Sequence, residues 1–170
     1  WQKIGADVFT KSVSVTQICI SPTNNAHFAV GTARNGLYVT NDGGVTFSHF
    51  GAELVPVGEP VPASFFISAL EWGGGRIWAY APNLGLFYSE NNGSSFLPSE
   101  LLVDVDLDDP EAGSDMPVLV NNITVNPSFP DHVLVAMNFN GVFQTFDAGD
   151  SWSNTYGDLH VSRPDSLLGL

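Results

Sequence analysis

An eight-residue pattern occurs three times in the 170-residue sequence, and it constrains the fold more than any other feature. The pattern is a hydroxyl residue, any residue, Asp or Asn, any residue, Gly, any residue, a hydroxyl residue and an aromatic residue. We call each copy a box, and the boxes span residues 40–47, 89–96 and 145–152. Three matches in so short a chain indicate an internal repeat, because ordinary residue frequencies rarely produce one.

Each box has a mechanical interpretation as a turn between two strands. The Asp or Asn oxygen accepts hydrogen bonds from amides of its own turn, and Gly allows a positive φ. The hydroxyl groups hold further turn atoms, and the aromatic residue enters an apolar layer. We predict this structural role for Thr40, Asp42, Gly44 and Phe47, for Ser89, Asn91, Gly93 and Phe96, and for Thr145, Asp147, Gly149 and Trp152.

The second box argues against a metal-binding role. Asn91 stands where the other two boxes carry an acid. Asn keeps the hydrogen-bond acceptor but loses the negative charge that a metal ligand would normally need. We therefore expect the boxes to hold turns rather than cations.

Short runs rich in β-branched and aromatic residues precede each box and are bounded by Gly, Pro and Asn, which is typical of β-strands. A further run after each box makes four strands per repeat, and no window shows a helical period of 3.6. The runs before the boxes span residues 16–20, 27–32 and 36–40, then 65–72, 76–81 and 85–89, then 122–125, 132–137 and 141–145.

Four short antiparallel strands that recur about every 50 residues are the signature of a β-propeller blade. We predict an all-β chain: a β-propeller segment of about three four-stranded antiparallel blades, with the boxes at the outer rim and first strands nearest the axis. The predicted blades cover residues 5–50, 64–99 and 118–156, and residues 157–170 start a further blade or form a tail. The alternative is a β-sandwich whose turns match by coincidence.

Three blades do not close a ring, because propellers contain about 4–8 blades. We expect the remaining blades to come from the parent chain or from another subunit. Trp1 lies about one repeat before Phe47, where the aromatic residue of a preceding box would stand. We therefore expect the sequence to be part of a longer protein.

The boxes resemble the Asp-box, also called the BNR repeat, of β-propellers. That family includes sialidases, xyloglucanase-like glycoside hydrolases, sortilin-type receptors and a photosystem assembly factor. The resemblance covers nearly the whole chain, and it implies a propeller architecture but almost nothing about activity. The habitats common in the family, the strong acidity and the low Lys content lead us to expect a secreted, periplasmic or cell-surface protein.

The strand order of a blade places its turns on two opposite faces. The box face holds the boxes and the turns between first and second strands. The link face holds the turns between second and third strands and the links between blades, and by analogy with other propellers it is the usual ligand face. Asn is also favoured in turns for conformational reasons, which is the alternative explanation. The ligand-binding residues predicted on the link face are Arg34, Asn83, Asn138 and Asn140.

The charge balance disfavours two classes of partner. Eighteen acidic and five basic residues give a net charge of −13, which opposes binding to nucleic-acid phosphates and to anionic membrane surfaces. No apolar run approaches the roughly 18 residues of a spanning helix, so we expect no membrane insertion. The single cysteine, Cys19, excludes an internal disulfide and a Cys-based metal site, and we expect it to be buried in a strand.

The link before the third blade contains an acidic run, residues 104–111. This run raises a calcium alternative with Asp104, Asp106 and Asp108 as ligands, since Ca²⁺ prefers several carboxylates close together. The EF-hand pattern fails, because Asp109 stands where Gly is required. We therefore favour a solvated loop or strand extension, and we expect no cofactor and no metal.

No catalytic constellation is evident in the sequence. The four His residues lie far apart, no nucleophile elbow or phosphate-binding Gly loop is present, and the Arg-Ile-Pro motif of sialidases is missing. A glycosidase needs two carboxylates about 5–10 Å apart, and nothing in the spacing selects a pair. We predict a non-catalytic β-propeller scaffold or binding module for protein, peptide or glycan. The alternative is a fragment of a sialidase-like or xyloglucanase-like glycoside hydrolase with catalytic residues partly outside this segment.

Overall fold

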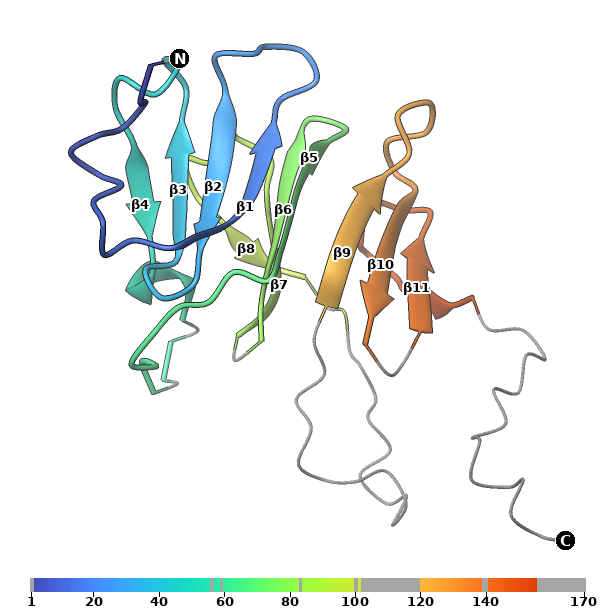
Figure 1. Ribbon diagram of the computed structural model, residues 1–170. Helices are drawn as coiled ribbons and strands as arrows, with labels where there is room; N and C mark the ends of the chain where they lie inside the picture. The colour runs from blue at the N-terminus through green and yellow to red at the C-terminus, as the bar shows by residue number, and fades with distance from the viewer. Residues whose placement is uncertain are drawn as a thin grey trace, which may run out of the picture.

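The computed structural model describes residues 2–55, 57–58, 60–82, 84–99, 101, 120–138 and 141–155. These residues form three antiparallel sheets of four strands each, which lie one after another along the molecule (Figure 1). Within each sheet the strands are hydrogen-bonded in chain order. The prediction of an all-β chain with three four-stranded sheets is confirmed, and we number the sheets as blades 1, 2 and 3.

The strand bounds show that the three blades have the same plan. Blade 1 consists of β1 (Val15–Ile20), β2 (Phe28–Thr32), β3 (Leu37–Thr40) and β4 (Ser48–Phe50). Blade 2 consists of β5 (Ala69–Gly73), β6 (Arg76–Ala81), β7 (Gly85–Ser89) and β8 (Leu97–Pro98). Blade 3 consists of β9 (Val120–Val125), β10 (Val133–Met137), β11 (Gly141–Thr145) and β12 (Ser153–Asn154). Among the described residues the helical content is one 3-10 turn, η1 (Ala52–Leu54), and no described helix is long and apolar enough to cross a membrane.

The apolar run expected at residues 65–72 is wrong as a single strand, because β5 begins only at Ala69. The residues before it pair instead with the turn between β2 and β3. The Phe65 N–H donates to the Arg34 carbonyl at 2.9 Å, and the Gly36 N–H donates to the Phe65 carbonyl at 2.8 Å. The run therefore contains a cross-blade connection followed by a strand, and both are extended and apolar.

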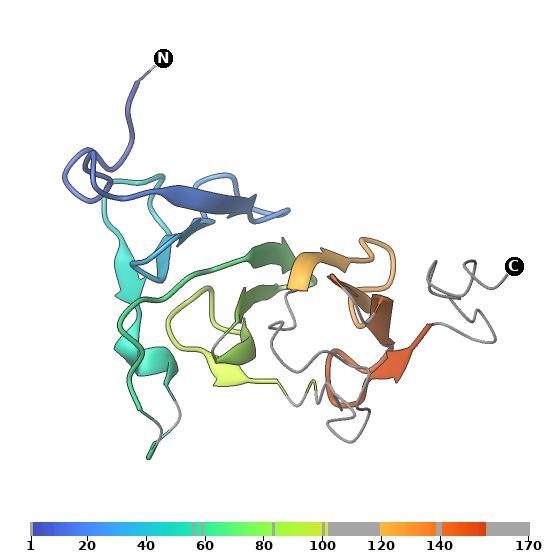
Figure 2. The same ribbon diagram turned by 60° about the horizontal axis from the view of Figure 1, so that its bottom comes forward.

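Neighbouring blades contact one another mainly through their first strands, β1 with β5 and β5 with β9. Figure 2 shows β1, β5 and β9 along one side of the molecule and the last strands of the blades on the other. This is the arrangement expected for blades set around an axis.

The hydrophobic core lies between the blades, and β6 shows how one strand serves two interfaces. Ile77 and Ala79 belong to the cluster between blades 1 and 2, whereas Trp78 and Tyr80 belong to the cluster between blades 2 and 3. Successive side chains of a strand point to opposite faces, so a strand buried on both faces is apolar throughout. Cys19 of β1 is buried, as the sequence predicts, and packs in the first cluster.

The turns separate into the two predicted faces. The Gly43 N–H of the first box donates to the Ala26 carbonyl in the β1–β2 turn at 2.8 Å, and the Ala148 N–H of the third box donates to the Asp131 carbonyl in the β9–β10 turn at 3.0 Å. In Figure 1 these turns lie at the top, and the β2–β3 turn lies at the bottom. Boxes and first turns therefore share one face.

Candidate functional site

A buried hydroxyl group at the first position closes each box. Thr40, Ser89 and Thr145 are each 1% exposed. Each Oγ donates to the Oδ1 of the Asp or Asn two residues later, at 2.7, 2.9 and 2.6 Å. Each also accepts the N–H of the box Gly, at 3.0, 2.9 and 2.9 Å. The hydroxyl therefore supplies the partner that this turn amide would otherwise take from water.

The acid at the third position accepts hydrogen bonds from the hydroxyl residue at the seventh position. Asp42 accepts the Thr46 N–H at 2.9 Å and the Thr46 hydroxyl at 2.6 Å. Asp147 accepts the Ser151 N–H at 2.9 Å and the Ser151 hydroxyl at 2.5 Å. Hydrogen bonds to the charged form, the Thr46 and Ser151 hydroxyls foremost, lower the pKa of both carboxyl groups to about 2. Both side chains are thus charged acceptors already occupied by their own turns.

Asn91 builds the same turn without a charge. Its Oδ1 accepts the Ser95 N–H at 3.0 Å, and its Nδ2 donates to the Ser95 hydroxyl at 2.9 Å. All three boxes therefore have a side-chain hydrogen bond between the third and seventh positions. In the second box the third residue donates it, whereas in the other two boxes the hydroxyl of the seventh residue donates it. In the part of the chain that the structure describes, no group of three or more His, Cys, Asp or Glu side chains is placed to hold a metal ion.

The Gly at the fifth position of a box also contacts the preceding blade. A Cβ added to Gly93 would lie 2.6 Å from Cγ1 of Val39 in blade 1, and a Cβ added to Gly149 would lie 2.7 Å from Cη2 of Trp78 in blade 2. Both glycines have a positive φ. The sequence pattern indicates the conformational reason for Gly but gives no sign of this close approach between blades.

On the link face, Arg34 is exposed in the turn between β2 and β3. The backbone of this turn is fixed by the Thr32 hydroxyl, which donates to the Gly36 carbonyl at 2.8 Å and accepts the Asn35 N–H at 2.9 Å. The backbone of Phe65, in the link to blade 2, pairs with the same turn. The Arg34 side chain is therefore presented from a rigid support.

The structure places one further member of the predicted ligand site. Asn138 follows β10 and is half-buried. The cluster stays a prediction, because Asn83 and Asn140 lie outside the described residues. The residues of the calcium alternative, Asp104, Asp106 and Asp108, also lie outside them.

The described acids differ in their surroundings. Burial raises the pKa of Glu71, a half-buried residue of β5 that lies opposite Trp78 in the pairing with β6. The Gly51 N–H donates to Glu53 at 3.0 Å and lowers the pKa of that carboxyl group. Glu90 forms an ion pair with Arg76. A raised pKa suits a general acid, and Glu71 is therefore the described carboxyl group to test in any hydrolase hypothesis.

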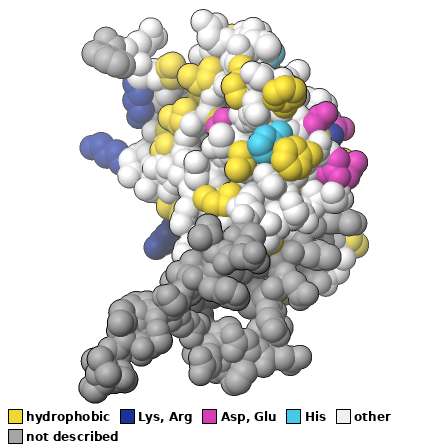
Figure 3. Space-filling model, turned by 90° about the vertical axis from the view of Figure 1, so that its right-hand side faces the viewer, with side chains coloured by type: hydrophobic (Ala, Val, Ile, Leu, Met, Phe, Trp, Pro, Cys, Tyr) yellow, Lys and Arg dark blue, Asp and Glu magenta, His cyan; other side chains and the backbone are white. Residues whose placement is uncertain are grey.

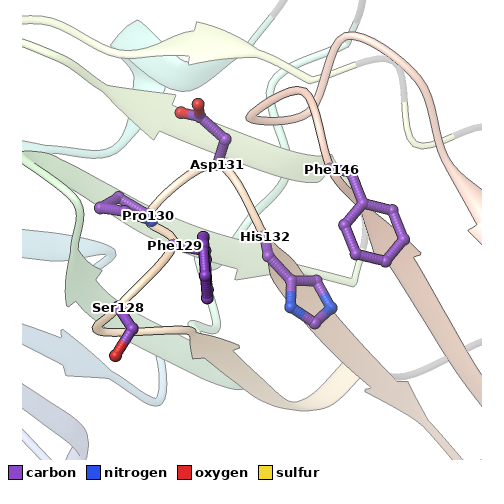
Figure 4. A pocket seen from close by; sticks show the side chains of 6 residues that line it. All are labelled: Ser128, Phe129, Pro130, Asp131, His132 and Phe146. Carbon is purple, nitrogen blue, oxygen red and sulfur yellow. The ribbon is translucent and has the colours of Figure 1, made fainter.

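Sequence reasoning missed a pocket on blade 3, which is formed by the β9–β10 turn and the third box. It has a volume of about 480 Å³ and is lined by Ser128, Phe129, Pro130, Asp131, His132 and Phe146 (Figure 4). Figure 3 shows hydrophobic side chains around a histidine on this side of the molecule. The His132 ring stacks on Phe146 with centroids 4.4 Å apart. Phe146 occupies the second box position, where the other boxes have Asn41 and Glu90. This aromatic residue at a polar position was the sequence feature that could have indicated the pocket.

Solved structures with a similar fold are β-propellers. The chain is similar to YCF48 from Cyanidioschyzon merolae, with a TM-score of 0.60, 15% identity, and coverage of 85% of this chain and 38% of that one. A structure of YCF48 bound to D1 peptide gives a TM-score of 0.58 at 14% identity, covering 84% and 40%. The GH74 xyloglucanase from Xanthomonas campestris gives 0.56 at 15% identity, covering 82% and 21%.

The chain thus spans two fifths or less of the length of these propellers. No protein-family model and no curated protein matches the sequence. At this level of identity the similarity shows the fold alone. Together with the three four-stranded sheets, it establishes the chain as a β-propeller segment.

Proposed function

We propose that the chain is part of a non-catalytic β-propeller that binds a protein, peptide or glycan through its link face. The observation that carries this proposal is the exposed Arg34 on a turn whose backbone is fixed by the following link. A support that is rigid before binding lowers the cost of ordering the site. Asn83, Asn138 and Asn140 are proposed to complete the site, because amides offer both a donor and an acceptor to sugar hydroxyls and peptide groups.

The link whose backbone fixes the Arg34 turn also carries exposed apolar side chains, which suits a ligand with both polar and apolar parts. Phe66 is 39% exposed and Val61 is 62% exposed, and both lie in the link whose residue Phe65 pairs with the Arg34 turn. Arginine and aromatic residues are enriched at protein-binding patches, and aromatic rings also pack on apolar ligand faces.

The second candidate function is a glycoside hydrolase segment, and the observation in its favour is the raised pKa of Glu71. A hydrolase needs a second carboxyl group at a defined separation. Asp42 and Asp147 are poor candidates, because their oxygens are occupied by the box turns. The partner of Glu71 would therefore have to be another carboxyl group of the full protein.

We further propose that the boxes are Asp-boxes of the BNR type, supported by the recurrence of the same hydrogen bonds in all three copies. The remaining blades are supplied by the parent chain or by another subunit. The parent protein is secreted, periplasmic or on the cell surface, which is supported by the net charge of −13 and is tested by reading the start of its gene.

The experiment screens the full natural protein on glycan and peptide arrays and assays turnover of sialosides and β-glucans. We expect binding without turnover, weakened about tenfold or more by Arg34→Ala. Lys11→Ala, which removes an exposed cation of the N-terminal segment, is the matched control and should bind normally. Turnover that is abolished by Glu71→Gln, or by any other single carboxylate substitution, would refute the binding-module proposal.

A further inference from the structure

The pocket formed by the β9–β10 turn and the third box has aromatic walls. Phe129 and Phe146 line it and are 70% and 66% exposed. His132 lies between them in Figure 4 and stacks on Phe146, with ring centroids 4.4 Å apart and ring planes at 17°. The volume of about 480 Å³ is in the range of small-molecule sites. Two large exposed rings at a concave site indicate an interaction surface rather than an ordinary turn.

Hydrogen bonds hold these walls in place before any ligand binds. In the turn, the Phe129 N–H donates to the Asn126 carbonyl at 3.2 Å, and the His132 N–H donates to the Phe129 carbonyl at 2.8 Å. The Asn126 side chain donates through Nδ2 to Nδ1 of His132 at 3.3 Å and so orients the ring that supports Phe146. The Ala148 N–H of the box donates to the Asp131 carbonyl at 3.0 Å and joins the two walls. A site fixed in this way loses little conformational entropy on binding.

The charges around the pocket favour a cation. The turn between β9 and β10 and the third box contain three acids, Asp131, Asp147 and Asp150, and no Lys or Arg. Asp131 and Asp150 are exposed, and Asp147 is ionised at neutral pH because its pKa is about 2. Arg76 reaches the backbone of this box but forms an ion pair with Glu90. Figure 3 shows acidic side chains beside the hydrophobic group on this face. The local field therefore attracts positive charge.

The lining side chains also select the kind of cation. Figure 4 shows the side chains of Ser128 and Asp131 directed away from the three rings, so the lining presents ring faces rather than hydrogen-bond acceptors. A Lys or Arg side chain brings N–H donors, which are costly to bury without acceptors. A trimethylammonium group has no N–H donor, and its methyl groups pack directly on the negative faces of aromatic rings. This group matches both the charge and the apolar surface of the pocket.

We propose that the pocket between the β9–β10 turn and the third box binds the trimethylammonium group of a small organic cation. The ring faces of Phe129 and Phe146 contact the methyl groups, and His132 supports the Phe146 ring from behind. Asp131 and the acids of the box contribute a negative field without touching the ligand. This second site lies on the box face, is separate from the site proposed on the link face, and stands whether or not that site binds.

The test titrates the full natural protein with choline and with the alcohol that carries a tert-butyl group in place of the trimethylammonium group. The two probes have nearly the same shape, so the comparison isolates the charge. Ligand-detected NMR measures both Kd values. We expect saturable binding of choline, with a Kd at least about threefold below that of the alcohol.

Two variants locate the site. Phe129→Leu and Phe146→Leu keep an apolar side chain but remove the ring, and each should raise the Kd for choline about threefold or more. Both positions are exposed, so the Tm should stay unchanged. Val45→Ala, at an 82% exposed position of the first box, is the control and should bind choline normally.

Three results would overturn the proposal. Without saturable binding of choline, or with equal Kd values for choline and the alcohol, the pocket would not be a cation site. An unchanged Kd for choline in both Phe variants would place the binding elsewhere. Tighter binding of a trimethyllysine peptide than of choline would show that the ligand is a modified protein rather than a small molecule.

Discussion

Gly93→Ala tests the packing of a box on the preceding blade, with Gly43→Ala as a matched control. The φ values are 77° and 75°, so the added Cβ strains both backbones by about 1–2 kcal/mol. At position 93 the Cβ would meet three side-chain atoms of Val39 at 2.6, 2.9 and 3.0 Å, whereas at position 43 it meets nothing within 4 Å. Overpacking of this kind costs about 1–3 kcal/mol.

We therefore expect a loss of unfolding free energy of about 1–2 kcal/mol for Gly43→Ala and about 2–5 kcal/mol for Gly93→Ala. Urea unfolding followed by tryptophan fluorescence measures both values under one set of conditions. Val39→Ala, added to Gly93→Ala, should recover part of the loss because it removes the atoms that the new Cβ meets. Equal losses for the two glycine variants would refute the proposed contact between box and blade.

Four further predictions concern the boxes and the core. Thr145→Val leaves a buried turn amide without its acceptor and should cost about 1–3 kcal/mol in urea unfolding, against little change for the exposed control Thr124→Val. Asp147→Asn should keep the Tm near that of the parent at neutral pH, because an amide already fills this position in the second box, whereas Asp147→Ala should lower it. Since Asp42 and Asp147 have a folded pKa of about 2, below the ordinary 3.8, stability should fall as the pH drops from about 4 to 2. Thermal melts of Asp147→Asn should show a smaller decrease of Tm over this pH range. An equal decrease in the variant and the parent would contradict the contribution assigned to Asp147. Burial, and to a lesser extent Glu71, raises the pKa of the Cys19 thiol to about 12, so a thiol reagent should modify Cys19 only as fast as the protein opens.

The sequence predicts the blades well because their signals are local. A box such as residues 40–47 carries its hydroxyl, acid, glycine and second hydroxyl within one turn, and the hydrogen bonds of the structure join these same residues. The strands are likewise predicted from residues that are close together in the chain, namely short apolar runs bounded by turn residues. Burial on both faces explains why β6 is apolar without alternation, and the sequence pattern still identifies it as a strand.

Contacts between blades were not predictable in the same way, because they join residues that are distant from one another in the chain. Nothing near Phe65 in the sequence indicates that its backbone pairs with the turn at Arg34. The stacking of His132 on Phe146 also depends on how a turn and a box of one blade meet in space. The ligand site on the link face belongs to this class, since its proposed members come from three different blades.

The central claim is that the box face stabilises the fold and the link face binds the ligand. The most direct test measures Tm and Kd together for one variant of each face. The ligand is the one found on the glycan and peptide arrays. We expect Asp147→Ala to lower the Tm and to leave the Kd of the folded protein within about twofold. Arg34→Ala should leave the Tm unchanged and raise the Kd about tenfold or more. A raised Kd for Asp147→Ala at an unchanged Tm, with normal binding by Arg34→Ala, would contradict the assignment of the two faces.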